Sequence, residues 1–139
     1  MFRSVRLATL FVAASSVAVP VEGHHAFASE FDAARPITVE GTISKVEWVN
    51  PHSWLYVDVV MEDGATVLWM FESGTPTALV RHGLTHEVLA PGSVVTIQGY
   101  RSRQPYCNPV CRGAGHHIIL ADGRKIYIAS FGAGTSDID

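Results

Sequence analysis

The sequence predicts an all-β protein with one short helix, folded into a small closed barrel of five to six strands. Three observations lead to this prediction. Short segments alternate apolar and polar side chains, which is the period of two typical of half-buried strands. Glycine and proline stand between these segments, where the chain must turn. The first segment also changes its alternation midway, which indicates the bend that a barrel strand requires.

The first strand is predicted over residues 36–48. Apolar side chains or glycine occupy every second position over residues 37–43. Val46 and Trp48 continue this face only if one extra residue is inserted near positions 44–45. We therefore expect a β-bulge at this point.

A corner and a second strand follow. The Asn-Pro-His sequence at residues 50–52 ends the first strand, because proline drives the residue before it out of the helical region. The second strand, over residues 53–61, places Trp54 and Tyr56 on one face and aliphatic side chains on the other. Because the aliphatic face must fill the barrel, the two rings are expected on its outer wall.

The remaining elements are predicted from the same signals. Thr75 is a suitable N-cap for a short helix, Pro76 suits its first position and Gly83 suits the position just past its end. Asp-Gly pairs mark the hairpin turns. Further strands are expected over residues 67–72, 93–100, 116–120 and 125–129.

This order of elements matches a Greek-key barrel of the OB (oligonucleotide/oligosaccharide-binding) type. A bent first strand and a single helix after the third strand are the features that agree. A β-sandwich is the alternative architecture. A closed sheet leaves no exposed edge for aggregation.

Residues 1–23 have the layout of a secretory signal peptide, with Arg3 and Arg6, an apolar run over residues 7–19 and a small residue at Gly23. The run is shorter than the roughly 20 residues that a membrane-spanning helix needs. Cleavage after Gly23 is the expectation, with cleavage after position 18 or an uncleaved anchor as alternatives.

The predicted mature protein is a single domain over residues 24–131, followed by a flexible tail over residues 132–139. We expect it in the periplasm or secreted, and not spanning the membrane after cleavage. Loss of Arg3, Arg6 and Glu22 with the leader leaves 8 basic and 12 acidic residues out of 10 and 13, a formal charge of −4. Such a chain lacks the positive field that nucleic-acid binding requires. A small molecule or another exported protein is the expected partner.

Several unusual sequence segments agree in order and spacing with those of one known family. The chain resembles a family of small exported bacterial proteins, domain of unknown function number 6152, from His24 to about Gly134. The resemblance implies an exported small β domain and carries no activity to any residue. The segments are HHAFASEFD, ITVEGTISKVEWVNPHSWLYVDV, FESGTP, GLT, LAPGSVVTIQGY and LADGRKIY.

Exposed aromatic rings on the first three strands suggest a ligand face, because such rings stack on flat ligands. In the other interpretation, Phe27 and Phe31 of the N-terminal segment cover these rings. His52 is expected to bond Glu72 or a turn carbonyl more readily than to act in catalysis. The candidate ligand-binding residues are Trp48, Asn50, His52, Trp54 and Tyr56.

The chain contains seven histidines, and two pairs are neighbours in sequence. Imidazole is a good ligand for copper and zinc. The hypothesis is a copper or zinc site built from His24, with its free amine after cleavage, His25, and one of His52, His116 or His117. The competing interpretation is a frayed polar N-terminus beside a strand that turns one histidine of the second pair to solvent, as alternation requires.

Cys107 and Cys111 are the two cysteines, with Asn-Pro-Val between them. In an oxidising compartment a disulfide closing this small loop is expected, worth on the order of 2 kcal/mol. A redox pair normally has two intervening residues. A thiolate metal site that includes His116 is the other alternative.

No catalytic motif stands out, since the chain has no G-x-S-x-G elbow, phosphate loop or H-E-x-x-H helix. The sequence therefore predicts a non-enzymatic exported binding module with an aromatic ligand face. The alternative is a histidine-based accessory protein that binds copper or zinc.

Overall fold

The computed structural model describes residues 24–104, 107 and 109–130, with side chains from Phe27 onward. The predicted signal peptide and the predicted tail lie outside the described residues. Within them, no helix is long and apolar enough to cross a membrane.

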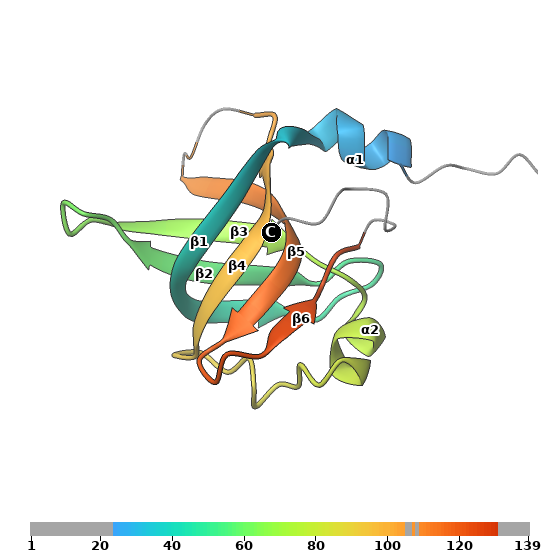
Figure 1. The fold of residues 1–139 in the computed structure, drawn as a ribbon, viewed down its shortest axis with the longest axis vertical. Coiled ribbons are helices and arrows are strands. Elements are labelled where there is room, and N and C mark those ends of the chain that lie inside the picture. Colours follow the sequence, from blue (N-terminus) through green and yellow to red (C-terminus); the bar gives the residue numbers. More distant parts are fainter. Residues whose placement is uncertain (1–23, 105–106, 108, 131–139) are drawn as a thin grey trace, which may run out of the picture.

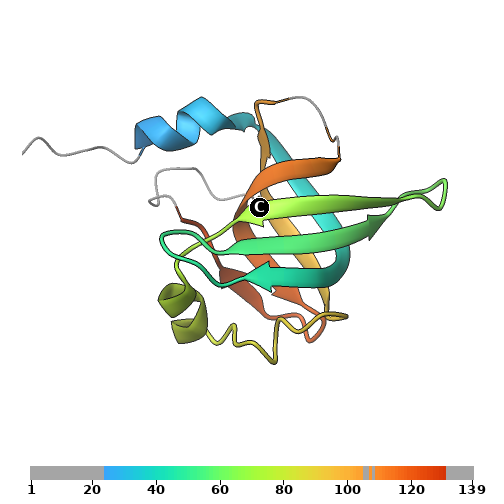
Figure 2. The ribbon, with the colours of Figure 1, turned by 180° about the vertical axis from the view of Figure 1, so that it is seen from behind.

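In the described residues, five strands form a closed barrel and a sixth strand extends its sheet, which confirms the predicted fold class (Figures 1 and 2). The sheet runs in the order β3-β2-β1-β4-β5-β6, and a parallel pairing between β3 and β5 closes it. The elements are α1 (His24–Glu30), β1 (Phe31–Glu47), β2 (Trp54–Val60), β3 (Thr66–Glu72), α2 (Pro76–Arg81), β4 (Val94–Ser102), β5 (Val110–Leu120) and β6 (Lys125–Tyr127).

The barrel interior is filled by the apolar faces of the strands. Helix α2 and the loop after it close one end of the core with Leu79, Leu84 and Leu89. Thr75 caps α2 by accepting a hydrogen bond from the amide of Ala78, as the sequence predicts. The most deeply buried strand residues include Leu55, Val57, Phe71, Ile97 and Ile118.

Besides a longer irregularity between Phe31 and Pro36 of β1, the described strands contain two one-residue β-bulges that bend the barrel. In β1, Ile43 pairs with Val57 and Lys45 with Tyr56, so that Ser44 is the extra residue. This is the bulge that the alternation predicts. The second bulge is in β5. Here Gly99 of β4 pairs with Gly115 and Gln98 pairs with His117, which leaves His116 as the extra residue.

Strand β5 begins six residues earlier than predicted, at Val110. The alternation of apolar and polar residues does not reveal the first half of this strand, because glycine occupies the inward positions 113 and 115. A Cβ at Gly113 would press on the ring of Phe71, and one at Gly115 on the side chain of Ile128. The strand therefore cannot carry the apolar side chains by which buried strands are recognised.

The N-terminal segment is helical and packs on the outer wall of β4. Phe27 of α1 lies 5.6 Å from Phe31 and 5.7 Å from Tyr100, measured between ring centroids. Phe31 and Tyr100 are buried. These contacts differ from the alternative in which Phe27 and Phe31 lie over the rings of β1 and β2, because Phe27 lies against Phe31 and Tyr100 instead. Residues 24–30 form a helix, which also differs from the frayed N-terminus of the competing interpretation.

Candidate functional site

Trp54 and Tyr56 lie on the outer wall of the barrel, half-buried and outside the core, as strand alternation predicts. Pairing of β1, β2, β3 and β5 sets the side chains around them in two rows. One row runs Glu47, Trp54, Glu72, and the other runs Lys45, Tyr56, Met70, Arg112. We call this surface the outer aromatic face, defined by Lys45, Glu47, Trp54, Tyr56, Glu72 and Arg112.

Each ring on this face has a cation above it. The Lys45 Nζ lies 4.2 Å from the centroid of the Tyr56 ring, and the Arg112 guanidinium carbon lies 5.4 Å from that of Trp54. Both distances are within the range of cation–π attraction. The face therefore presents ordered positive groups against aromatic surfaces.

Glu47 ties the lysine and the tyrosine together. Lys45 Nζ donates to Glu47 Oε1 at 2.6 Å, and the Tyr56 hydroxyl donates to Glu47 Oε2 at 3.3 Å. The hydrogen bond from Lys45 lowers the pKa of the Glu47 carboxyl, and the same bond raises the pKa of Lys45. Burial, followed by the charge of Glu47, raises the pKa of Tyr56. At neutral pH this corner is an ion pair beside a neutral phenol.

At the other end of the face, two side-chain nitrogen atoms have no hydrogen-bond partner among the described residues. These are the buried Nε of Arg112 and the buried Nδ1 of His52. His52 Nδ1 stands 3.5 Å from Glu72 Oε1, an ion-pair distance without hydrogen-bond geometry, while Ser130 Oγ donates to that oxygen at 2.9 Å. Buried polar atoms are seldom left unpaired, so this end of the face is suited to an added acceptor.

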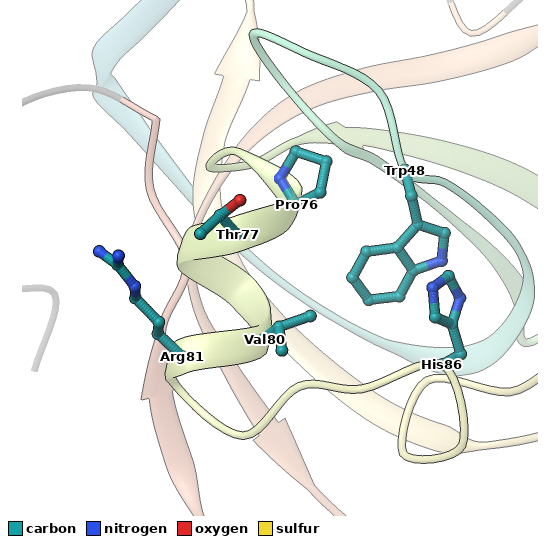
Figure 3. A pocket seen from close by; sticks show the side chains of 6 residues that line it. All are labelled: Trp48, Pro76, Thr77, Val80, Arg81 and His86. Atoms are coloured by element: carbon teal, nitrogen blue, oxygen red, sulfur yellow. The ribbon is translucent and has the colours of Figure 1, made fainter.

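Trp48, also predicted as a ligand residue, lies in a different place. It packs against the core and contacts the ring of His86, with 4.3 Å between ring centroids and 47° between the ring planes. It lines a hollow of about 290 Å³ beside α2 (Figure 3). In this view the side chain of Arg81 points away from Trp48, while Val80 points toward the hollow. The other lining residues are Pro76 and Thr77.

The five predicted ligand residues are thus divided. Trp54 and Tyr56 share the outer aromatic face, and His52 borders it through Glu72. Asn50 is exposed at the corner, where its peptide bond to Pro51 is cis. Lys45 and Arg112 were not predicted as part of this face. Arg112 could not be placed from the sequence, because the parallel pairing of β5 with β3 joins segments about forty residues apart.

Of the predicted metal ligands, the structure brings His116 and His117 together. Their Nδ1 atoms are 2.8 Å apart. His116 is buried and His117 is half-buried, so neither is fully turned to solvent, contrary to the alternation expected at this pair. The side chains of His24 and His25 lie outside the described ones, and the described residues contain no cluster of three metal-ligating side chains.

Cys107 and Cys111 form the predicted disulfide. The bridge is next to Arg101, whose guanidinium donates to Cys107 Sγ at 3.4 Å and lies 5.6 Å from the ring of Trp69. The cysteines are therefore structural in this state, and the alternative of a thiolate metal site does not fit a bonded pair.

Comparison with known proteins shows the family to which the chain is similar. No curated protein matches the chain, and no solved structure does. Residues 12–109 match the model of a family of unknown function, DUF6152. This match spans well over half of the sequence and agrees with the resemblance seen in the motifs. The chain belongs to the DUF6152 family.

Proposed function

We propose that this protein is a non-enzymatic binding module whose ligand lies on the outer aromatic face. The ligand combines a flat apolar part with a hydrogen-bond acceptor such as a carboxylate. The flat part stacks beside Trp54, and the acceptor meets Arg112. OB-type barrels use the outer face of strands β2 and β3 for their ligands, which is where these side chains stand.

One observation carries this proposal: the Nε of Arg112 is buried above the Trp54 indole without a hydrogen-bond partner. A guanidinium held by a ring is oriented before a ligand arrives, which reduces the entropy lost on binding. An acceptor placed there would satisfy the Nε donor, and a charged acceptor would form the stronger bond.

The test is a titration with a panel of small aromatic carboxylates, followed by tryptophan fluorescence and thermal shift. Trp54→Ala should remove binding and leave the far-UV circular dichroism unchanged. Arg112→Gln should weaken carboxylate binding by about tenfold or more, since hydrogen bonds to charged groups contribute about 1.5–3 kcal/mol.

Val60→Ala is the matched control. Val60 is at the opposite end of the same strand, 72% exposed and not among the residues that define the outer aromatic face, so its truncation should leave binding intact. If Trp54→Ala unfolds the chain, the ring is part of the core. If Trp54→Ala and Arg112→Gln bind every carboxylate as wild type does, the proposed site is wrong.

We also propose that the module acts outside the cytoplasm. Two features support this: the layout of residues 1–23 and the disulfide, a bond that persists in oxidising compartments. Cell fractionation with N-terminal sequencing should find the protein in the periplasm or medium, beginning near His24. Recovery of a full-length chain from the cytoplasm would contradict the proposal.

A further inference from the structure

The imidazole rings of two neighbouring residues lie against each other on β5. Neighbouring residues in a regular strand direct their side chains to opposite faces. Here His116 is the extra residue of a bulge, since Gly115 and His117 take the places opposite Gly99 and Gln98. The two ring centroids are 4.5 Å apart. The bulge therefore creates a histidine pair that a regular strand would separate, and bulges are frequent where a side chain must be re-aimed.

The pair is held in position by its surroundings. The ring of Tyr127 lies 5.2 Å from that of His116 and 5.6 Å from that of His117, edge-on to both. The rings of Tyr100 and His116 form a T-shaped pair, with 6.1 Å between their centroids. The carbonyl of His116 accepts the amide hydrogen of Ile128 at 2.9 Å. Rings fixed in this way keep the direction of their nitrogens, which metal sites require.

The separation of the two nitrogens is the length of a hydrogen bond between them, and it is also short enough for both to reach one metal ion. Two nitrogens at right angles on one ion, each about 2.0 Å from it, are about 2.8 Å apart, which suits tetragonal Cu²⁺. At a tetrahedral angle they would be about 3.3 Å apart, as Zn²⁺ prefers. The Nδ1 atoms of His116 and His117 are 2.8 Å apart.

We propose that His116 and His117 bind one divalent copper ion through their Nδ1 atoms. Without metal, one Nδ1 donates its hydrogen to the other. Ligation at both requires each neutral ring to carry its proton on Nε2, so the donating ring moves one proton from Nδ1 to Nε2 by way of water. A neutral pair loses no proton in this exchange. The two histidines supply two ligands, and water completes the coordination.

The experiment is a Cu²⁺ titration of the purified exported chain, followed by electron paramagnetic resonance and by visible absorption. One ion should bind per chain, with nitrogen ligands in the spectrum, and Zn²⁺ should bind at least about tenfold more weakly. His117→Ala should weaken Cu²⁺ binding by about tenfold or more. His117 is half-buried, so we expect the variant to fold, as circular dichroism will show.

Two controls separate this pair from other histidines. His86→Ala removes an exposed imidazole beside Trp48 and should leave Cu²⁺ affinity unchanged. A double variant, His24→Ala with His25→Ala, should also retain tight binding. If the double variant loses Cu²⁺ binding while His117→Ala keeps it, the site is at the N-terminus and the proposal is wrong. If the wild-type chain does not bind Cu²⁺ at all, the proposal is also wrong.

A measurement on the unmodified chain covers the case in which His117→Ala fails to fold. Substoichiometric Cu²⁺ broadens the nuclear magnetic resonance signals of nearby residues first. The signals of Tyr127 and Ile118 should broaden before that of Trp54 on the outer aromatic face. Broadening that begins at residues 24–27, or that is uniform over the chain, would contradict a site at the histidine pair.

Discussion

The two β-bulges have the same form and different results. The bulge at Ser44 shifts β1 by one residue and brings Lys45 and Glu47 to the outer wall, where they meet Tyr56. The bulge at His116 shifts β5 and brings two imidazoles together. A register shift of one residue exchanges the two faces of a strand. The proposed ligand face and the proposed copper site each depend on one such shift.

The two bulges also differ in what fixes them. Ser44 donates a side-chain hydrogen bond to the carbonyl of Tyr56 at 3.3 Å, so the bulged residue of β1 is attached to its partner strand. At the second bulge the backbone does this work, because Gly99 allows β4 to approach the backbone of β5 at Ala114 closely. A side-chain change at Ser44 therefore removes a hydrogen bond at the first bulge, whereas a side chain added at Gly99 overlaps backbone at the second.

The largest expected effect comes from Gly99→Ala. A Cβ at this position would overlap the carbonyl oxygen of Ala114, and backbone cannot move away as a flexible side chain can. We expect the free energy of unfolding to fall by about 3 kcal/mol or more, at the upper end of overpacking costs. Urea denaturation followed by circular dichroism measures it.

Gly64→Ala is the matched control for Gly99→Ala. Gly64 has a φ of 83° but nothing within 4 Å of an added Cβ, so only backbone strain is introduced. A loss of about 1 kcal/mol is expected there. Equal losses in the two variants would mean that close approach of β4 and β5 is not what fixes the second bulge.

The contrast also explains what the sequence could predict. The bulge at Ser44 is visible because apolar residues flank it on both sides, from Ile37 to Ile43 and again at Val46. The bulge at His116 follows Gly113 and Gly115, which carry no apolar signal, so the alternation has nothing to reveal. The outward direction of Trp54 follows from its own strand, whereas Arg112 above it depends on a pairing between distant segments.

A second prediction concerns the start of β5. The disulfide joins Cys107 to Cys111, the second residue of this strand, and loss of the bond should lower the free energy of unfolding by about 2 kcal/mol through the entropy of the unfolded chain. Denaturation with and without dithiothreitol measures the difference. Amide exchange should increase over residues 110–112 and stay unchanged near Ser44.

A Cys107→Ser variant provides the control for reduction. Cys107 is exposed, so the substitution adds no buried polar group, and the variant should be insensitive to dithiothreitol. Unaltered stability of the wild-type chain after complete reduction would show that the second bulge does not depend on the bridge.

The smallest expected effect is a change in ionisation at the first bulge. Because Lys45 lowers the pKa of Glu47 chiefly by hydrogen bonding, Lys45→Gln should raise that pKa toward its ordinary value of 4.5. Some lowering should remain, since the Tyr56 hydroxyl also donates to Glu47. The same variant should raise the pKa of Tyr56 further, because the charge of Lys45 lowers it. Nuclear magnetic resonance titration of the two side chains measures both shifts.

The sign of the pH dependence follows from the direction of the Glu47 shift. A carboxyl whose pKa is lowered by folding stabilises the fold above its unfolded pKa, and this contribution is lost as the pH falls through the folded pKa. Lys45→Gln should therefore reduce the acid sensitivity of the native chain. Lys45 reaches Glu47 only because Ser44 is inserted before it. If the pKa of Glu47 is unchanged in Lys45→Gln, the bulge does not control the electrostatics of the outer aromatic face.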